Sequence, residues 1–314
     1  MQVGLMAMAA VALMAVGVLA AAPAANATGG AGGVSVPGPG NAGNGGRVKL
    51  WEKAPGMVET GDDKEADPKE PTMDIFLPAE GKGTGQGMLI LPGGGYTNLA
   101  MPKEGADIAR VFVEKGVACF VVRYRHTPRY RGEIPLMDGQ RAVRMVRSRA
   151  AEWKVDPKKI GVLGFSAGGH LAACLATMAE NGPKAEKPDA IDGASARVDF
   201  VVLMYPVITF TDESVMYKAG RNVLAQQDKA LAEKLSPELH ETKDAPPAFL
   251  EATTTDRTVL VMNSVMYYEA CLKAKVPAEM HIFGAGAHGF GLAANDPVLS
   301  TWPEMAGKWL ERLK

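Results

Sequence analysis

A serine stands in a context that favours nucleophilic chemistry. The pentapeptide at 164–168 reads Gly-Phe-Ser-Ala-Gly, which is the pattern G-x-S-x-G centred on Ser166. An apolar segment that predicts a strand (159–163) precedes it, and a segment that predicts a helix (167–179) follows. A sharp strand-to-helix turn of this kind lifts the serine hydroxyl above the sheet, next to the free N–H groups of the helix start. We therefore predict that Ser166 is a nucleophile.

A serine hydroxyl at neutral pH needs a base, and the chain contains five histidines. His288 follows a predicted strand (278–283), and the glycines around it let its loop bend toward a neighbouring strand end. His170 lies one helical turn beyond Ser166 on the same predicted helix, where we expect a structural role. The sequence therefore favours His288 as the base.

Asp256 is the predicted third member of a catalytic triad. It follows the predicted strand 248–253, and its carboxylate would hold the imidazole in one tautomer and stabilise the imidazolium ion. Glu251 and Asp296 are alternatives, but Glu251 lies within the predicted strand and Asp296 lies beyond the histidine loop. The order serine, aspartate, histidine along the chain is the one expected for an α/β-hydrolase.

Three consecutive glycines at 93–95 predict an oxyanion hole. They follow a predicted strand (88–91), at the place where α/β-hydrolases carry a glycine-rich loop. Without side chains, the backbone N–H groups of such a loop are free to turn toward a developing negative charge. We assign Gly94, Gly95 and Ala167 as the donors.

Another glycine-rich segment has the form of a dinucleotide-binding motif. Residues 284–289 read G-x-G-x-x-G after a predicted strand. A dinucleotide site also needs a helix directly afterwards, a further strand, and an acidic residue about 20 positions on. Only the terminal helix, predicted at 302–313, remains in this chain. Cysteine and histidine spacing also indicates no metal site, so the sequence predicts neither a cofactor nor a metal.

The pattern of elements predicts the scaffold that positions these residues. Predicted strands and helices alternate, and the strands are apolar on both faces, which is typical of an α/β fold with a mostly parallel sheet covered by helices on both sides. In such sheets the active site lies beyond the carboxyl ends of the strands. The predicted strands are 73–77, 88–91, 117–123, 159–163, 200–205, 248–253 and 278–283, and the predicted helices are 104–115, 138–153, 167–179, 262–275 and 302–313.

The predicted helix 138–153 carries a stripe of basic residues. Asp138 is expected to be its N-cap. Arg141, Arg144 and Arg147 recur at i, i+3 spacing, and we expect them to form a solvent-exposed face.

The first 46 residues differ in composition from the rest. Residues 4–25 are uncharged and apolar and lead into Ala-Asn-Ala at 25–27, which predicts a secretory signal peptide at 1–27, although no basic residue precedes the apolar run. The alternative is an uncleaved membrane anchor. Residues 28–46 contain nine glycines and no charge, which predicts a flexible linker. The catalytic domain is then 47–314, and the expected location is secreted or periplasmic.

Overall composition excludes several classes of protein. The chain has 314 residues, of which 47% are hydrophobic, and a formal net charge of −1. This balance predicts no nucleic-acid partner, and the apolar content is too high for a disordered chain. The chain contains three cysteines, all in apolar or helical segments: Cys119, Cys174 and Cys271. We expect them to be small core residues, and their odd number argues against a disulfide framework.

Three segments together resemble a known family. The segments 92–96 (PGGGY), 164–170 (GFSAGGH) and 288–291 (HGFG) are similar to α/β-hydrolases of the acetylxylan esterase and bifunctional feruloyl/acetyl-xylan esterase type, and the resemblance runs over 73–313. It implies a secreted serine carboxylesterase that acts through an acyl-enzyme on acylated carbohydrate, such as acetylated xylan, or on a small ester. It implies no membrane partner after signal cleavage.

Two alternatives remain beside this interpretation. A serine peptidase of the prolyl-oligopeptidase type shares the order of the triad, but the chain has no room for the large N-terminal propeller of those enzymes. A catalytically silent hydrolase fold that serves as a binding module is the second, and a missing triad member would favour it. For an enzyme, the residues predicted to line the substrate pocket are Tyr96, His126, Tyr130, Tyr205 and Phe290.

Overall fold

The computed structural model describes residues 44–56, 70–180 and 188–313. The predicted signal peptide and most of the predicted linker lie outside the described residues. Within the described ranges, no helix combines the length and the apolar character needed to cross a membrane.

The last three residues of the predicted linker belong to the folded part of the chain. The N–H of Gly45 donates to the carbonyl oxygen of Ile75 at 3.0 Å. The side chain of Asn44 exchanges hydrogen bonds with the backbone N–H and carbonyl of Leu77. The prediction of a flexible linker up to residue 46 is therefore wrong for 44–46.

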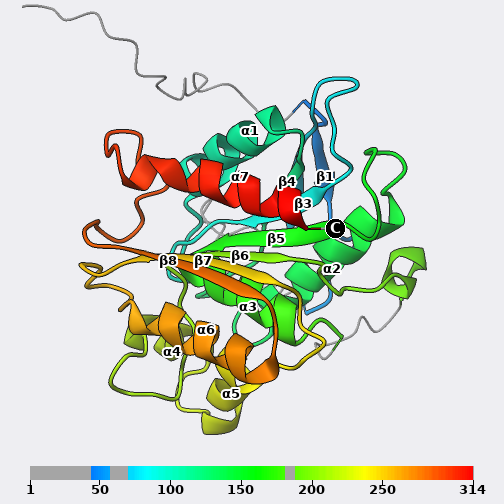
Figure 1. Cartoon of the computed structure of the whole chain (residues 1–314). Helices are drawn as coiled ribbons and strands as arrows, with labels where there is room; N and C mark the ends of the chain where they lie inside the picture. Colours follow the sequence, from blue (N-terminus) through cyan, green and yellow to red (C-terminus); the bar gives the residue numbers. More distant parts are fainter. Residues whose placement is uncertain (1–43, 57–69, 181–187, 314) are drawn as a thin grey trace, which may run out of the picture. The chain divides into compact units, whose positions relative to one another are not determined.

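An eight-stranded sheet runs through the described part of the chain (Figure 1), in the order β1-β2-β4-β3-β5-β6-β7-β8. The pairs β1–β2 and β2–β4 are antiparallel, and all later neighbours are parallel. This arrangement confirms the predicted α/β class. The strands are β1 (Arg47–Lys49), β2 (Thr72–Phe76), β3 (Gly87–Leu91), β4 (Ala118–Arg123), β5 (Ile160–Phe165), β6 (Val201–Met204), β7 (Ala248–Thr253) and β8 (Ala278–Phe283).

Helices cover both faces of this sheet (Figure 1). On one face pack α1 (Asp107–Glu114) and α7 (Trp302–Arg312), and on the other pack α2 (Ile134–Ser148), α3 (Ala167–Thr177) and α6 (Met262–Ala274). Two short helices, α4 (Lys218–Leu224) and α5 (Lys229–Lys234), lie between β6 and β7 along the chain. Single helical turns occur at Pro102–Ala106, Ala190–Gly193, Pro237–Leu239 and Leu299–Thr301.

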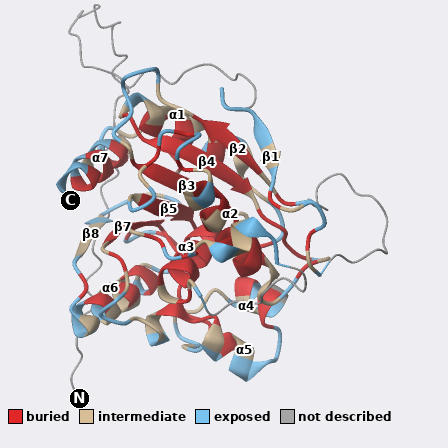
Figure 2. Ribbon diagram, turned by 90° about the vertical axis from the view of Figure 1, so that its right-hand side faces the viewer, coloured by how far each residue is buried: buried red, intermediate tan, exposed pale blue. Residues whose placement is uncertain are grey.

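The strands between the two edges fill a core on each side of the sheet. In β5, Val162 packs with the α2 and α3 side, whereas Leu163 and Phe165 pack on the α1 and α7 side with Trp302. Successive side chains of a strand point to opposite faces of the sheet. Because helices cover both faces, the side chains that point to either face are apolar. Figure 2 shows these inner strands buried, whereas the edge strands β1 and β8 are partly exposed. The three cysteines are free and buried, as predicted.

Helix α2 begins before the predicted residue, and Asp138 is not its N-cap. Asp138 lies inside the helix and is fully buried. Its carboxylate pairs with the guanidinium of Arg125, with 2.7 Å between Nη2 and Oδ1, and also accepts the backbone N–H of Arg125. A buried charge of this kind requires a charged partner, and Arg125 provides it from the segment that follows β4.

The basic stripe of α2 is also not a solvent-exposed face. Arg141 is only 2% exposed and pairs with Asp189 and Asp192. Arg144 and Arg147 are mostly covered, and their partners come from the same later part of the chain: Glu180 and Asp199. The expectation was wrong because these carboxylates, more than 30 residues farther on, fold back over the helix.

Candidate active site

Ser166 lies on a strained turn between β5 and α3. Its φ of 52° and ψ of −116° fall in a region that L-residues rarely adopt, and such strain clusters at functional sites. A Cβ atom on Gly164 would lie 2.2 Å from the carbonyl oxygen of Gly168, and one on Gly168 would lie 2.1 Å from that of Leu91. The turn therefore requires glycine at both positions, and it presents the serine at the carboxyl end of β5.

The structure brings the three predicted triad residues together. Oγ of Ser166 is 2.7 Å from Nε2 of His288, and Nδ1 of His288 is 2.6 Å from Oδ2 of Asp256. Nδ1–H donates to the carboxylate, which leaves Nε2 as the acceptor of the serine proton. Ser166 and the His288 side chain retain 6% and 19% exposure, so the hydroxyl and the ring remain reachable from solvent.

Asp256 is held as an ionised acceptor by its surroundings. Oδ1 accepts the backbone N–H groups of Thr258 at 2.8 Å and Val259 at 3.0 Å. Burial acts to raise the pKa of Asp256, but the hydrogen bonds from His288 and the two N–H groups outweigh it and place the pKa below its usual value. The carboxylate is therefore charged at neutral pH, as an orienting group for an imidazolium must be.

The two alternative acids are placed differently. Glu251 is fully buried inside β7, neither of its carboxylate oxygens has a partner among the residues that the structure describes, and burial raises its pKa to about 9. Asp296 accepts the N–H groups of Val298 and Leu299, so it stabilises a turn. Of the three candidate acids, Asp256 is the one that contacts His288.

Two threonines that were not predicted from the sequence join the loop after β7, which carries Asp256, to the loop after β8, which carries His288. Oγ1 of Thr253 donates to the carbonyl oxygen of Gly286 at 2.8 Å. Oγ1 of Thr255 donates to the same carbonyl at 3.0 Å and accepts the N–H of Gly286 at 2.9 Å. Because β7 and β8 are parallel neighbours, the loops after them lie side by side, and this pairing fixes the distance between Asp256 and His288.

The glycine loop, residues 92–96, is anchored through its carbonyl groups. The carbonyls of residues 92, 93, 94 and 96 accept hydrogen bonds from Tyr124, Ala100, Thr97 and Thr127. In contrast, none of the hydrogen bonds found within 44–56, 70–180 and 188–313 uses the N–H of Gly94, Gly95 or Ala167. A Cβ atom on Gly93 would lie 3.0 Å from Cβ of Ser166, so the loop adjoins the serine. Open N–H groups beside a nucleophile are what an oxyanion hole requires.

Of the five residues predicted to line the pocket, only Phe290 is partly exposed. The Tyr205 ring packs against the rings of His288 and Phe290, with centroid distances of 5.2 and 4.6 Å. The hydroxyl of Tyr96 contacts Nδ1 of His170 at 2.7 Å, inside the protein. The buried members of the set, which are packed too deeply to form an open wall, are Tyr96, His126, Tyr130 and Tyr205.

Tyr217 is a side chain near the site that the sequence analysis did not identify. A Cβ atom on Gly95 would lie 3.2 Å from the Tyr217 hydroxyl, so this partly buried ring reaches the glycine loop from the residue before α4. No motif marks the segment between β6 and α4, so nothing in the sequence pointed to this contact.

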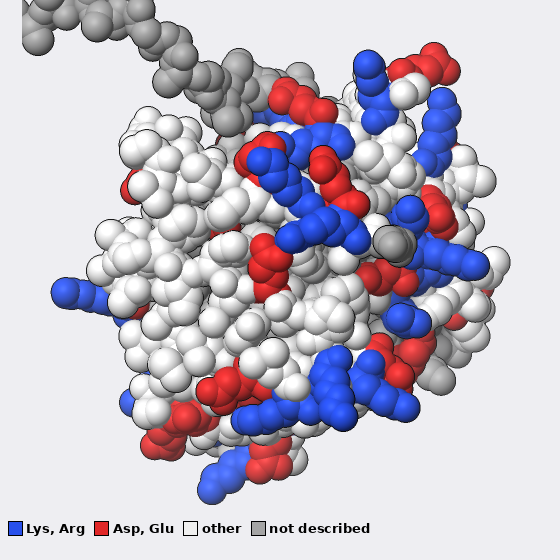
Figure 3. Space-filling model, in the orientation of Figure 1, with Lys and Arg blue, Asp and Glu red and all other residues white. Residues whose placement is uncertain are grey.

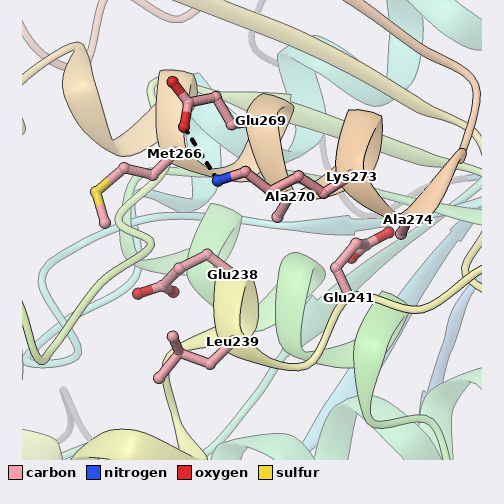
Figure 4. A pocket seen from close by; sticks show the side chains of 8 residues that line it. All are labelled: Glu238, Leu239, Glu241, Met266, Glu269, Ala270, Lys273 and Ala274. Carbon is pink, nitrogen blue, oxygen red and sulfur yellow. Dashed lines mark hydrogen bonds and ion pairs between the residues drawn. The ribbon is translucent and has the colours of Figure 1, made fainter.

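A separate hollow lies between α6 and the turn Pro237–Leu239 (Figure 4), with a volume of about 420 Å³. Figure 4 shows three glutamates around it, with Lys273 paired to Glu269 at 3.4 Å. Burial raises the pKa of Glu241 to about 7. Of the described residues, no serine or cysteine paired with a histidine lines this hollow. Its lining residues are Glu238, Leu239, Glu241, Met266, Glu269, Ala270, Lys273 and Ala274.

Charge is mixed over the face that Figure 3 displays. Positive and negative side chains lie next to one another around its upper, right and lower parts (Figure 3), and a broad area without charged side chains lies between them. Many of the charged side chains pair, as Lys115 does with Glu304 at 2.6 Å.

The strand order, the helices on both faces and the strained serine turn are those of an α/β-hydrolase. The BD-FAE family model matches residues 73–271, and the chain belongs to that family. The family resemblance stated from the motifs is thereby confirmed.

Relatives of the chain are named as esterases and as a xylanase. An acetylxylan esterase of Xylanibacter ruminicola is 31% identical over 247 residues, which are 77% of this chain and 48% of that protein. Endo-1,4-beta-xylanase B of Butyrivibrio fibrisolvens is 35% identical over 224 residues, 68% of this chain and 34% of that protein. The chain thus spans about half or less of the length of these curated relatives.

Solved structures show the same fold over a larger share of their length. An acetyl ester-xyloside bifunctional hydrolase from Caldicellulosiruptor lactoaceticus has a TM-score of 0.77 and 34% identity, covering 87% of this chain and 98% of that one. A thermophilic esterase from the Planctomycetes species Thermogutta terrifontis, bound to propionate, has a TM-score of 0.65 and 26% identity, covering 81% and 94%.

Proposed function

We propose that this chain is a serine carboxylesterase that removes acyl groups, chiefly acetyl, from carbohydrate such as xylan. The observation that carries the proposal is the unbroken hydrogen-bonded path from Ser166 through His288 to Asp256, beside a loop with open N–H groups. The complete triad argues against a silent binding module, and the relatives' names favour an esterase over a peptidase.

The geometry supports a two-step reaction. Nε2 of His288 takes the proton of Ser166 as Oγ attacks the ester carbonyl, while Asp256 stabilises the imidazolium ion and the glycine loop binds the oxyanion. Nε2 then protonates the departing alcohol oxygen, which leaves an acyl group on the serine. The same imidazole then takes a proton from a water molecule, whose oxygen attacks the acyl-enzyme carbonyl. As the bond to Oγ breaks and the carboxylic acid leaves, the imidazolium ion returns the proton to Oγ of Ser166.

Two observations support the substrate and location within this proposal. An acetylxylan esterase and an acetyl ester-xyloside hydrolase are both similar to the chain. The pattern of a signal peptide at 1–27 fits a polymeric substrate, because a polysaccharide does not enter the cell. We therefore propose that the enzyme is secreted or periplasmic and acts on acetylated xylan or its oligosaccharides.

The replacement Ser166→Ala tests the mechanism. We expect kcat for p-nitrophenyl acetate to fall by at least about 10⁴-fold, because a triad without its nucleophile retains only binding and oxyanion stabilisation. The matched control is Ser214→Ala, which removes an exposed serine hydroxyl and leaves the triad intact. A Ser166→Ala protein as active as its parent, or a parent that a fluorophosphonate probe does not label, would contradict the mechanism.

A comparison of substrates tests the acyl group. We expect the parent to release acetate from acetylated xylan faster than it cleaves methyl ferulate or tributyrin at equal ester concentration. Faster cleavage of methyl ferulate would replace acetyl with feruloyl in the proposal and leave the serine mechanism standing.

A further inference from the structure

A buried carboxylate lies between the two loops of the proposed active site. Glu104, in the helical turn Pro102–Ala106 that leads into α1, is only 4% exposed. Its Oε2 accepts the backbone N–H of Gly93 at 2.8 Å, and its Oε1 accepts the hydroxyl of Tyr205 at 2.9 Å. Each carboxylate oxygen therefore contacts a different segment, one in the glycine loop and one after β6.

Tyr205 continues this connection to the histidine loop, residues 284–291. Its hydroxyl accepts the N–H of Gly291 at 3.1 Å while it donates to Glu104, and its ring packs edge-on against the imidazole of His288. Its φ of 37° is unusual for a tyrosine, and strain of this kind persists only where the surroundings impose it. Burial and the Glu104 charge raise the pKa of Tyr205 well above its usual value, so the hydroxyl keeps the proton that it donates.

We propose that Glu104 and Tyr205 are positioning residues that hold the glycine loop and the histidine loop in their reactive arrangement. This proposal rests on the serine esterase function. The hydrogen bond from Gly93 fixes the first peptide of the glycine loop and directs the next two N–H groups toward the substrate. The hydrogen bond from Gly291, three residues beyond His288, fixes the loop that carries the base.

The expected effect follows from the precision that the site requires. Glutamine has one acceptor oxygen and an amide group that only donates, so in Glu104→Gln either the N–H of Gly93 or the O–H of Tyr205 loses its acceptor, and no charge-assisted hydrogen bond remains. Displacement of oxyanion donors or of a base by about 1 Å costs on the order of 10²-fold in rate. We therefore expect Glu104→Gln to lower kcat by about 10²-fold and to change KM less than about threefold, since the bridge acts on the transition state.

Tyr205→Phe removes the hydroxyl but keeps the ring against His288. We expect kcat to fall by roughly tenfold or more, because a buried Gly291 N–H and one Glu104 oxygen lose their partner. Both residues act through one bridge, so the double variant should be no more than about threefold slower than the worse single variant. Affinity for a trifluoromethyl ketone, which forms a tetrahedral adduct with the serine, should fall in parallel with kcat/KM.

Matched substitutions separate positioning from loss of folding. Glu251→Gln and Tyr267→Phe change a buried glutamate and a buried tyrosine that lie in β7 and α6, outside the two loops. We expect both to keep the parental kcat. Thermal unfolding of every variant shows whether the assay contains folded protein, and if Glu104→Gln does not fold, Tyr205→Phe decides alone.

The outcomes distinguish this proposal from the proposed function. Parental kcat in folded Tyr205→Phe and Glu104→Gln, with Ser166→Ala inactive, would overturn the positioning role and leave the esterase function intact. Additive losses in the double variant, or a rise in KM at constant kcat, would also overturn it. A parent protein that cleaves no ester would overturn both proposals together.

Discussion

Two carboxylates five residues apart, Glu251 and Asp256, occupy the interior of β7 and the loop that follows it. Both are buried, yet burial raises the pKa of Glu251 to about 9, whereas the pKa of Asp256 lies below its usual value. The loop residue receives hydrogen bonds from His288 and from two backbone N–H groups, and the strand residue receives none among the described residues.

The difference shows why chemistry collects at the ends of parallel strands. Inside β7, backbone N–H groups are used by the ladders to β6 and β8 and cannot stabilise a carboxylate. Past the last strand residue the ladder ends, so backbone N–H groups turn to side chains and neighbouring loops meet. An acid in the loop is therefore charged and in contact with the base, whereas an acid in the strand is neutral.

Asp256→Asn should give the largest loss of activity among variants of these carboxylates. We expect kcat for p-nitrophenyl acetate to fall on the order of 10³- to 10⁴-fold, because an amide neither selects the correct imidazole tautomer nor stabilises the imidazolium ion. Steady-state kinetics, with circular dichroism to verify folding, measures this. Near-parental activity would show that another carboxylate orients His288.

Glu251→Gln should leave kcat unchanged and should alter the way in which the free energy of unfolding depends on pH. The folded-state pKa of about 9 lies above the unfolded value, so between roughly pH 4.5 and 9 only the folded state holds the proton, and parental stability falls as pH rises. At about pH 9 we expect the variant to exceed the parent in free energy of unfolding, and the difference between them to be larger than at pH 5 by on the order of several kcal/mol, since each pKa unit corresponds to about 1.4 kcal/mol. Urea unfolding at several pH values should show this gap narrowing toward pH 5; a gap independent of pH would contradict the neutral, buried state.

Asp296→Asn should have the smallest combined effect on activity and stability among variants of these carboxylates. Asparagine keeps an acceptor for the N–H groups of Val298 and Leu299, so the turn remains. We expect kcat within about twofold of the parent and a change in stability below about 0.5 kcal/mol. A loss of activity comparable to that of Asp256→Asn would mean that the acid beyond the histidine loop takes part in the reaction.

Elements that depend on local pattern were predicted with good accuracy. The bounds of β7 and β8 agree with the structure, because each is a short run that begins directly after a proline, Pro247 or Pro277, and ends at turn residues. The turn at Ser166 was predictable because the pentapeptide and the strand and helix patterns on either side of it are local, although the glycine at 168 is also required by the backbone of Leu91 in a neighbouring strand. The order of the triad then restricted the base and the acid to the loops after β8 and β7.

Features that depend on distant partners were not predictable. The arginines of α2 follow the spacing of an exposed stripe, but carboxylates at 180–199 cover them. Glu104 lies in a turn with no motif, and its function depends on Tyr205, which is 101 residues away. The residues predicted to line the pocket are aromatic, and residue type does not indicate whether a ring packs in the interior or lies at the wall of a pocket.

Local sequence patterns are sufficient to predict the α/β class, the nucleophile turn and the candidate triad residues, because glycine spacing and apolar runs are properties of short segments. Only the folded structure determines which carboxylate is ionised, which hydrogen bonds anchor the glycine loop, and which side chains connect that loop to His288. These properties depend on burial and on hydrogen-bond partners from separate strands, and such contacts exist only after the sheet has brought the strand ends together.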